Sequence, residues 1–292
     1  MTKVGFVGLG HMGLPMAVNL LKKGYEVVGY DISEQSKQSF LAQGGSVVDN
    51  LQDLARDKAV VITMLQTPAQ VLDVCVGVEG IFKIMQPGAL FMDCSTIGVE
   101  TACRFHDEAV KHQLLSLDAP VSGGVRGAVL GTLTLMVGGE SSVFETYQPL
   151  LSCLGKTIVH TGAAGTGQAA KLCNNMLLGI SMIAVSEAFL LAERLGLSHQ
   201  KLHEIVSQSS GQCWAMSVHA PVPSVVPQSP ANYGYQPGFT TKMMLKDLRL
   251  SQEAAKAVGI STTLGALATE IYTKKEARIS DLDFSAIITC IA

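Results

Sequence analysis

The segment Val4-Gly-Phe-Val7-Gly8-Leu-Gly10-His-Met-Gly13 decides the fold class of this chain. An apolar run typical of a buried strand leads into the pattern G-x-G-x-x-G, and an amphipathic stretch follows it. In such a turn the first glycine permits the bend, the second lets backbone approach a phosphate, and the third lets helix pack on strand. The helix N-terminus then attracts the phosphates. We therefore predict a dinucleotide-binding loop that contains Gly8, Gly10, His11, Met12 and Gly13.

A second strand and an acidic residue extend this pattern. The apolar run Glu26–Tyr30 ends in Asp31, 18 residues beyond Gly13. An acid at this place accepts hydrogen bonds from ribose hydroxyls and repels a 2′-phosphate, which favours NAD over NADP. The alternative is a plain strand–helix–strand turn with a surface aspartate, but strand, loop, helix and acid in register favour the binding loop. We expect NAD as the cofactor and an oxidoreductase as the class of protein.

The alternation of short apolar runs with amphipathic stretches continues to about residue 160. It predicts an α/β, Rossmann-type fold with a doubly wound, mostly parallel sheet. Two of the helices are expected over Met12–Lys23 and Val99–His112. The predicted strands are Val4–Leu9, Glu26–Tyr30, Val60–Met64, Leu90–Asp93, Leu114–Asp118, Leu133–Val137 and Thr157–His160.

Beyond the glycine-rich segment 162–167, which we interpret as a hinge, the pattern becomes helical. A long helix over Gln168–Leu195 is expected, followed by helices at His199–Gln208, Thr240–Val258, Thr263–Lys274 and Phe284–Ile291. The proline-rich segment 221–237 cannot be helical throughout, and it predicts an ordered loop or a lid over a site. The prediction is therefore an NAD-binding domain over 1–163 and an all-helical substrate and oligomerisation domain over 164–292. A cleft between them is the default ligand site.

Composition excludes several classes of protein. The net charge is −3, with 21 basic and 24 acidic side chains and no basic block, so we expect neither nucleic acid nor a membrane surface as partner. The most apolar stretch, Met176–Ala192, contains Ser181, Ser186 and Glu187 and predicts a buried helix. Seven cysteines without a CxxC pair favour free thiols, and no signal or transit segment is evident, so a cytoplasmic location is expected. The spacings match no metal site and no G-x-S-x-G hydrolase.

Hydride transfer to NAD needs a group that takes the hydroxyl proton. The seven histidines show no neighbouring acid at a telling spacing, and those in helices are expected to be exposed. Lys171 is the better candidate, because it follows the glycine segment by one helical turn and shares a helix face with Asn175. Desolvation would lower the pKa of this lysine towards the range of a base. An exposed lysine is the alternative on spacing alone.

The turn Ser122-Gly123-Gly124 follows Asp118 at the end of another predicted strand. A hydroxyl and unhindered backbone N–H groups suit a carboxylate, although an ordinary turn is the alternative. Trp214, the only tryptophan, is interpreted either as an apolar wall of the substrate site or as a core aromatic.

These motifs together resemble the β-hydroxyacid dehydrogenase family over nearly the whole chain. Gly8–Leu20 looks like the family's N-terminal signature, Asp118–Gly124 like its substrate motif, and Gly165–Asn175 like its catalytic motif. Lys246-Asp247-Leu248 looks like a fourth motif, which closes over the cofactor. The resemblance implies that Lys171 is the acid/base, that Asn175 orients substrate, and that Ser122, Gly123 and Gly124 hold its carboxylate. It also implies cofactor contacts from Leu65, Gln66, Gln70, Thr96, Phe239, Lys246 and Asp247.

The resemblance implies a small hydroxyacid substrate. Ser209–Trp214, Pro221-Val-Pro223 and Gly238-Phe239-Thr240 look most like the members that act on 3-hydroxyisobutyrate. The expected reaction is its NAD-dependent oxidation to methylmalonate semialdehyde, a step of valine degradation. Alternatives are reduction of tartronate, succinic or glyoxylic semialdehyde, or a sensor that binds dinucleotide without catalysis. The long apolar helix favours a homodimer or homotetramer.

Overall fold

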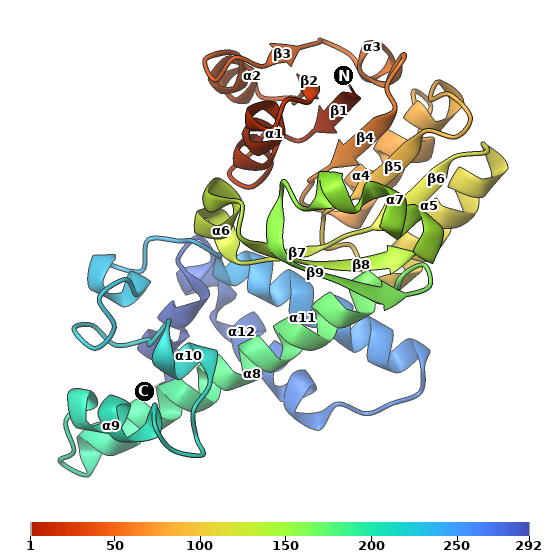
Figure 1. Ribbon diagram of the computed structural model, residues 1–292. Coiled ribbons are helices and arrows are strands. Elements are labelled where there is room, and N and C mark those ends of the chain that lie inside the picture. The colour runs from red at the N-terminus through yellow and green to blue at the C-terminus, as the bar shows by residue number, and fades with distance from the viewer. Residues whose placement is uncertain (1, 292) are drawn as a thin grey trace. The chain divides into compact units, whose positions relative to one another are not determined.

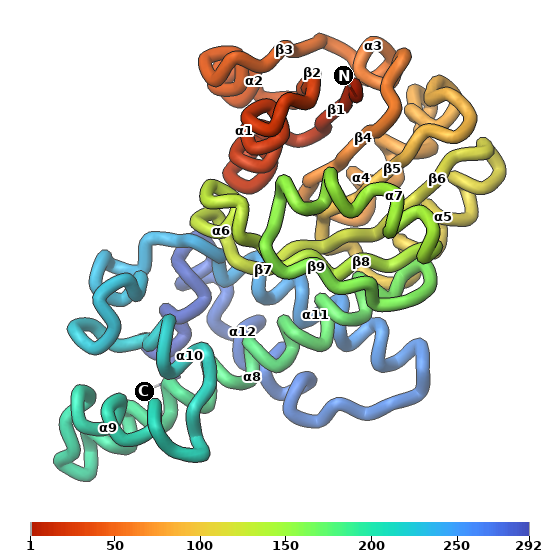
Figure 2. Tube along the Cα trace, in the orientation of Figure 1, coloured from red at the N-terminus to blue at the C-terminus, as the bar shows by residue number. Residues whose placement is uncertain are grey.

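The computed structural model describes residues 2–291 and divides into two compact units, residues 1–171 and 172–292 (Figures 1 and 2). The N-terminal unit is an α/β structure and the C-terminal unit is helical. The long helix α8 (Thr166–Arg194) begins in the first unit and continues through the second. The expected domain boundary at 163/164 stays a prediction.

A sheet of nine strands forms the centre of the N-terminal unit over the described residues up to 171. The strand order is β3-β2-β1-β4-β5-β6-β8-β7, with β9 paired to β8. The first six are parallel, whereas β8 runs antiparallel to β6 and β7. The strands are β1 (Lys3–Val7), β2 (Glu26–Tyr30), β3 (Ser46–Val47), β4 (Val60–Thr63), β5 (Leu90–Asp93), β6 (Leu115–Asp118), β7 (Val121–Ser122), β8 (Leu133–Gly139) and β9 (Gly155–Gly162).

Helices cover both faces of this sheet, which explains the almost unbroken apolarity of its strands (Figure 1). Val60 and Ile62 of β4 pack into one core, and Val61 packs into the other. Helices α1 (Gly13–Lys22), α2 (Glu34–Leu41), α6 (Gly124–Leu130) and α7 (Ser141–Leu151) contribute buried side chains to the first core. The second core receives side chains from α3 (Leu51–Ala55), α4 (Pro68–Val76), η1 (Ile81–Lys83) and α5 (Val99–Lys111).

The prediction of a Rossmann-type, mostly parallel sheet is confirmed. The sequence pattern missed β3 and β7, which have two residues each and are too short to show a period. Strand order reverses on the two sides of β1, whose neighbours are β2 and β4. Ligands of open α/β sheets bind at such a switch point, beyond the carboxyl ends of the strands. The glycine loop follows β1 there.

The C-terminal unit packs its helices around a core that includes Phe189, Met244, Tyr272 and Phe284. Its further elements are α9 (His199–Val206), α10 (Trp214–Ser217), η2 (Pro230–Tyr233), α11 (Thr241–Ala257), α12 (Thr263–Ile279), η3 (Phe284–Ile287) and α13 (Ile288–Ile291). The single helix expected over the last residues is divided into η3 and α13. Across the described residues 172–291, strand pairing is limited to one bridge between Thr240 and Asp283.

Helix α8 carries long apolar stretches. Among the described residues it is the one helix long and apolar enough to cross a membrane, and 44% of its most apolar window is buried. Buried core helices pass the same test. Gly196 (φ +79°) ends the helix region, and Ser198 caps α9 by accepting a hydrogen bond from Lys201 N–H, as predicted.

The proline-rich segment is ordered and contributes to the core. Val222, Val225 and Val226 are buried with the side chains of the C-terminal unit. Ser229 Oγ donates to Ala220 O at 2.5 Å, and Tyr235 Oη donates to Pro221 O at 2.9 Å. The segment is therefore an ordered loop whose apolar side chains belong to the core, and its expected place over a site stays a prediction.

Candidate active site

The three glycines of the first loop have three different environments. Gly8 has φ +93°, and a Cβ there would clash with Met64 O, so only glycine can make this bend. A Cβ on Gly13 would clash with Gly8 O, which means that α1 starts in direct contact with the turn. Gly10, in contrast, has no protein atom within 4 Å of a Cβ position. The loop is therefore closely packed at its ends and open at its middle glycine.

Asp31 holds this loop from the end of β2. Its Oδ2 accepts from Leu9 N–H at 2.6 Å, and its Oδ1 accepts from Ser33 N–H at 2.7 Å. Gly8 N–H donates to Tyr30 O at 2.9 Å, directly before the aspartate. The acid is thus fixed beside the open loop with its remaining lone pairs available to a ribose. His11 is exposed, and Met12 is at the N-cap of α1.

The segment after β4 is stabilised by a capping box. Gln70 Oε1 accepts from the N–H groups of Gln66 and Thr67, both at 3.1 Å, while Thr67 Oγ1 accepts from Gln70 N–H at 3.2 Å. The Thr-x-x-Gln signal is readable from the sequence, and the sequence analysis missed it. The Gln70 side chain, expected at the cofactor, therefore bonds to its own helix. Leu65 N–H donates to Ser95 Oγ at 2.8 Å.

The turn Ser122-Gly123-Gly124 connects β7 to α6. Gly123 has φ +130° and Gly124 has φ +63°, and a Cβ on Gly124 would meet open space. Side chains other than glycine rarely adopt these conformations. Ser122 ends a strand that pairs with Thr134 of β8. A Cβ on Gly123 would lie 3.2 Å from Leu133 Cδ2, so the turn is open at Gly124 rather than along its whole length. Its role as a carboxylate site stays a prediction.

Lys171 and Asn175 lie one turn apart on α8, and both are buried, with exposed fractions of 7% and 2%. Asn175 Nδ2 donates to Asp247 Oδ2 at 2.5 Å, and Asn175 Oδ1 accepts from Asn174 Nδ2 at 2.9 Å. Lys246 Nζ lies 3.0 Å from Asp247 Oδ1. The fourth motif therefore reaches the catalytic motif through Asp247, which fixes the Asn175 amide. That contact spans 72 residues and was missed.

The glycine segment before α8, interpreted as a hinge, is fixed by the carboxylate of Asp118. Asp118 accepts from Gly165 N–H at 2.8 Å and from Gln168 N–H at 2.9 Å, and His106 Nε2 lies 3.0 Å from it. The other ring nitrogen of His106 lies 2.7 Å from Ser116 Oγ. The expectation that His106 is exposed was wrong, and it has an acidic partner that its sequence spacing did not indicate. The partner comes from the next strand, whose position the tertiary fold decides.

Gln168, which had no predicted role, extends this network. Its Oε1 accepts from Ile97 N–H at 3.0 Å and Gly98 N–H at 3.3 Å, and its Nε2 donates to Ser95 O at 2.8 Å. The side chain is fully buried. It therefore bonds to the loop that contains Thr96, the residue expected at the nicotinamide ribose.

Asp93 is a second buried carboxylate at the same sheet edge, paired in register with Asp118. Its Oδ1 accepts from Thr63 Oγ1 at 2.6 Å and Ser95 Oγ at 2.7 Å, whereas its Oδ2 has no hydrogen-bond partner. Burial raises the pKa of Asp93 to about 6, and the two hydroxyl donors oppose the rise.

Trp214 starts α10 and is 47% exposed, so the interpretation as a core aromatic was wrong. Its ring stacks on His219, with centroids 4.8 Å apart, and His219 stacks on Phe284 at 5.2 Å. His219 Nε2 lies 2.8 Å from buried Asp283 Oδ1, a second pair between a histidine and a distant acid that was missed. Phe239 packs edge-on against Phe284 at 5.8 Å.

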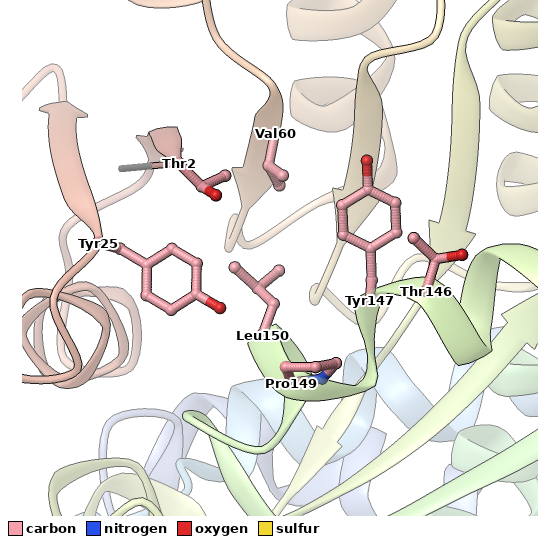
Figure 3. A pocket seen from close by; sticks show the side chains of 7 residues that line it. All are labelled: Thr2, Tyr25, Val60, Thr146, Tyr147, Pro149 and Leu150. Atoms are coloured by element: carbon pink, nitrogen blue, oxygen red, sulfur yellow. The ribbon is translucent and has the colours of Figure 1, made fainter.

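Other features of the structure lie outside these groups. All seven cysteines are free thiols. Over residues 2–291, no three His, Cys, Asp or Glu side chains gather as metal ligands would. A small cavity of about 130 Å³ lies at the amino ends of β1 and β4, the edge opposite the glycine loop (Figure 3). It is lined by Thr2, Tyr25, Val60, Thr146, Tyr147, Pro149 and Leu150.

Comparison with known proteins finds a family model for each half of the chain and relatives that match nearly its whole length. Residues 3–162 match the NAD binding domain of 6-phosphogluconate dehydrogenase, and residues 165–291 match the family "NAD-binding of NADP-dependent 3-hydroxyisobutyrate dehydrogenase". The mitochondrial 3-hydroxyisobutyrate dehydrogenase of Homo sapiens is 44% identical over 98% of this chain and 85% of its own length. The NAD-dependent L-serine dehydrogenase of Pseudomonas aeruginosa is 42% identical over 93% of this chain and 91% of its own. The structure of Mycobacterium tuberculosis 3-hydroxyisobutyrate dehydrogenase with L-serine aligns over 100% of both chains, with a TM-score of 0.95 and 45% identity.

Proposed function

This chain belongs to the 3-hydroxyisobutyrate dehydrogenase family of oxidoreductases, and from that premise we propose that it oxidises 3-hydroxyisobutyrate to methylmalonate semialdehyde with NAD. The observation that carries the proposal is the burial of an amine and an amide, Lys171 and Asn175, one turn apart on α8. A buried lysine is rare unless a function or a partner retains it.

The glycine loop fits a dinucleotide. Gly8 and Gly13 could not carry a Cβ, whereas the space over Gly10 is open, as a pyrophosphate that approaches the backbone requires. When bound, NAD supplies the hydride acceptor of the oxidation. The Asp31 carboxylate, fixed by Leu9 and Ser33 N–H groups, supports NAD as the preferred form because it would repel a 2′-phosphate. The description of the C-terminal family as NADP-dependent makes this preference worth measuring.

Lys171 is the proposed proton acceptor. As the C–H bond of the substrate carbinol breaks, the O–H proton passes to the neutral Lys171 amine, and the carbon–oxygen bond becomes a carbonyl. Asn175, whose amide is fixed by Asp247, orients the hydroxyl. The hydroxyl of Ser122 and the backbone N–H groups of Gly123 and Gly124 hold the carboxylate, which suits the positive φ of both glycines and the open space at Gly124. Leu65, Gln66, Thr96, Phe239 and Lys246 are proposed cofactor contacts, and Trp214 is a proposed apolar wall of the substrate site.

Replacement of Lys171 tests the proposal. Lys171→Ala is expected to lower kcat for 3-hydroxyisobutyrate by about 100- to 10,000-fold while NAD binding survives. Lys171→Arg keeps the positive charge but cannot release a proton at working pH, so it should be equally inactive. Lys256→Ala, at an exposed position on α11, is the control. Near-normal turnover by Lys171→Ala would overturn the assigned role.

Oxidation of L-serine is the second candidate. It is favoured by the relative named NAD-dependent L-serine dehydrogenase and by the similar structure described with L-serine. Serine is a 3-hydroxyacid with an ammonium group where 3-hydroxyisobutyrate has a methyl group. Specificity constants for both substrates, each with NAD and NADP, separate the candidates. We propose that 3-hydroxyisobutyrate with NAD gives the highest value.

The remaining proposals concern context. A homodimer or homotetramer, a cytoplasmic location, and the absence of nucleic-acid and membrane partners stay predictions. The Homo sapiens relative is named as mitochondrial. A cytoplasmic location of this chain would therefore differ from that of this relative.

A further inference from the structure

The first turn of α8 is held by two separate sets of hydrogen bonds. Asp118, at the end of β6, accepts from the backbone N–H groups of Gly165 and Gln168. The Gln168 side chain makes three more bonds to the β5–α5 loop, to Ser95, Ile97 and Gly98. All of these groups lie within residues 1–171. A turn with so many long-range bonds is fixed in position, since each bond would leave a buried polar group unpaired if it broke.

Ser95 connects the same network to the segment after β4. Its Oγ accepts from Leu65 N–H at 2.8 Å and donates to Asp93 Oδ1 at 2.7 Å, while its carbonyl accepts from Gln168. A continuous path of hydrogen bonds therefore runs from Leu65, where it is partly buried, through buried Ser95 and Gln168 to the start of α8. Two of these segments, around Leu65 and around Thr96, are proposed cofactor contacts.

Gln168 lies three residues before Lys171, so the two side chains lie close to one face of the same helical turn. A displacement of Gln168 displaces Lys171 with it, because the helix backbone is stiff over one turn. Reaction rates are sensitive to such displacements, and about 1 Å of misplacement can lower a rate 100-fold.

We propose that Gln168 is a positioning residue that sets Lys171 in register with the cofactor-binding loops at residues 65 and 95–98. Asp118 holds the backbone of the turn, and Gln168 connects that turn to the loops. The inference rests on the proposed function, because it assumes that Lys171 takes the proton. It assigns to Gln168 an effect on the rate of the chemical step rather than on the affinity for NAD.

The test compares two replacements of Gln168. Gln168→Met keeps the length of the side chain and loses all three side-chain bonds, so we expect kcat to fall about 10- to 100-fold while the KM for NAD changes less than about threefold. Gln168→Glu restores the pattern only when it is protonated, with one oxygen accepting from Ile97 and Gly98 and the O–H donating to Ser95. The site is fully buried, and the Asp93 carboxylate bonds to the same Ser95, so the pKa of such a glutamate should be raised. The kcat of Gln168→Glu relative to wild type should therefore rise as pH falls from about 8 to 6, whereas the ratio for Gln168→Met should stay constant.

Ser186→Ala is the matched control, because it removes one buried hydrogen bond of the same helix, from Ser186 Oγ to Met182 O, far along the chain from the network. It should lower stability without changing kcat. Amide hydrogen exchange gives a readout that is independent of turnover: Gln168→Met should speed exchange at Ile97 and Gly98.

The outcomes separate the inference from the proposed function. If Lys171→Ala is inactive and Gln168→Met has the kcat of Ser186→Ala, the positioning role is overturned and the proposed function stands. If Lys171→Ala remains active, the proton-acceptor role of Lys171 is overturned, and the positioning role with it. If the wild type turns over neither 3-hydroxyisobutyrate nor L-serine, the proposed function is overturned. A flat pH ratio for Gln168→Glu at a reduced kcat would also contradict the inference, since a merely structural defect does not depend on that proton.

Discussion

Two glycine-rich turns connect a strand to a helix in the N-terminal unit, and they use glycine for different reasons. In Gly8–Gly13 the middle glycine faces open space, and the Asp31 carboxylate accepts a hydrogen bond from the backbone of the turn at Leu9. In Gly162–Gly167 the space is occupied, because a Cβ on Gly167 would lie 2.6 Å from Asp118 O and one on Gly165 would lie 2.9 Å from Cys103 Sγ. The first turn leaves room for a ligand at its middle glycine, whereas the second is packed tightly against Asp118 and Cys103.

The difference extends to the helix N-termini. The start of α1 lies beside an open loop, whereas the N–H groups at the start of α8 already bind an anion, the buried Asp118 carboxylate. A protein side chain thus occupies at α8 the kind of place that a phosphate takes at a nucleotide-binding helix. The lesson is that a glycine-rich turn before a helix predicts an anion, but the fold decides whether that anion is a ligand or part of the chain.

A pair of alanine substitutions, one in each turn, should show the largest difference between the two turns. Gly10→Ala places a methyl group in the open space, so it should weaken NAD binding about 10- to 100-fold and leave the free energy of unfolding unchanged. Gly167→Ala forces a methyl group against the Asp118 backbone, so it should lower the free energy of unfolding by about 2–4 kcal/mol. Calorimetric NAD titration and urea denaturation of both variants measure the two effects. Equal loss of stability in the two variants would contradict the contrast.

The second buried carboxylate at this edge gives a pH-dependent prediction. Folding raises the pKa of Asp93 to about 6, so the folded protein binds this proton more tightly than the unfolded chain. The stabilisation from Asp93 is fully present below about pH 4 and is lost as pH rises through 6, a change on the order of 3 kcal/mol. Asp93→Asn should remove this dependence, so its free energy of unfolding should improve relative to wild type between about pH 4 and 7.

Urea denaturation across that pH range measures the difference, with Asp107→Asn on the exposed side of α5 as control for the loss of one charge. A wild-type curve parallel to that of Asp93→Asn would show that the buried carboxyl does not titrate in this range.

The smallest expected effect concerns the capping box after β4. Gln70→Ala removes the bonds to the N–H groups of Gln66 and Thr67, and it should lower the free energy of unfolding by about 1 kcal/mol. The KM for NAD should change less than about twofold, since the side chain is engaged by its own helix. A tenfold increase in that KM would show instead that Gln70 contacts the cofactor, as the family resemblance implied.

Much of the fold could be predicted from local patterns in the sequence. Apolar runs of four or more residues predicted β1, β2, β4, β5 and β6 within two residues at each end, because strands buried on both faces leave an almost unbroken apolar record. The misses were the two-residue strands and the capping box of Gln70. The two-residue strands are too short to show a period. The capping box had a readable Thr-x-x-Gln signal that was not recognised.

The candidate site divides in the same way. The sequence singled out the glycine loop, Asp31, Ser122–Gly124, Lys171 and Asn175 as candidates, because each belongs to a short motif of neighbouring residues. Asp118, Gln168, His106 and Asp247 received either no role or a different one. Each forms a hydrogen bond with a partner at least 12 residues away in the sequence, and local periodicity cannot indicate such a contact.

Sequence patterns alone indicated the class of sheet and the dinucleotide loop, since hydrophobic period and glycine stereochemistry act within a few residues. The resemblance to a known family implied the residues of a hydroxyacid oxidation. Long-range contacts, visible once the chain is folded, show that the second glycine turn is held by Asp118 and that Gln168 connects that turn to the loops at 65 and 95–98. Those contacts depend on which strands become neighbours in the sheet. Packing of the whole unit sets that order, and it brings carboxylates and amides that are distant in the chain to one buried edge.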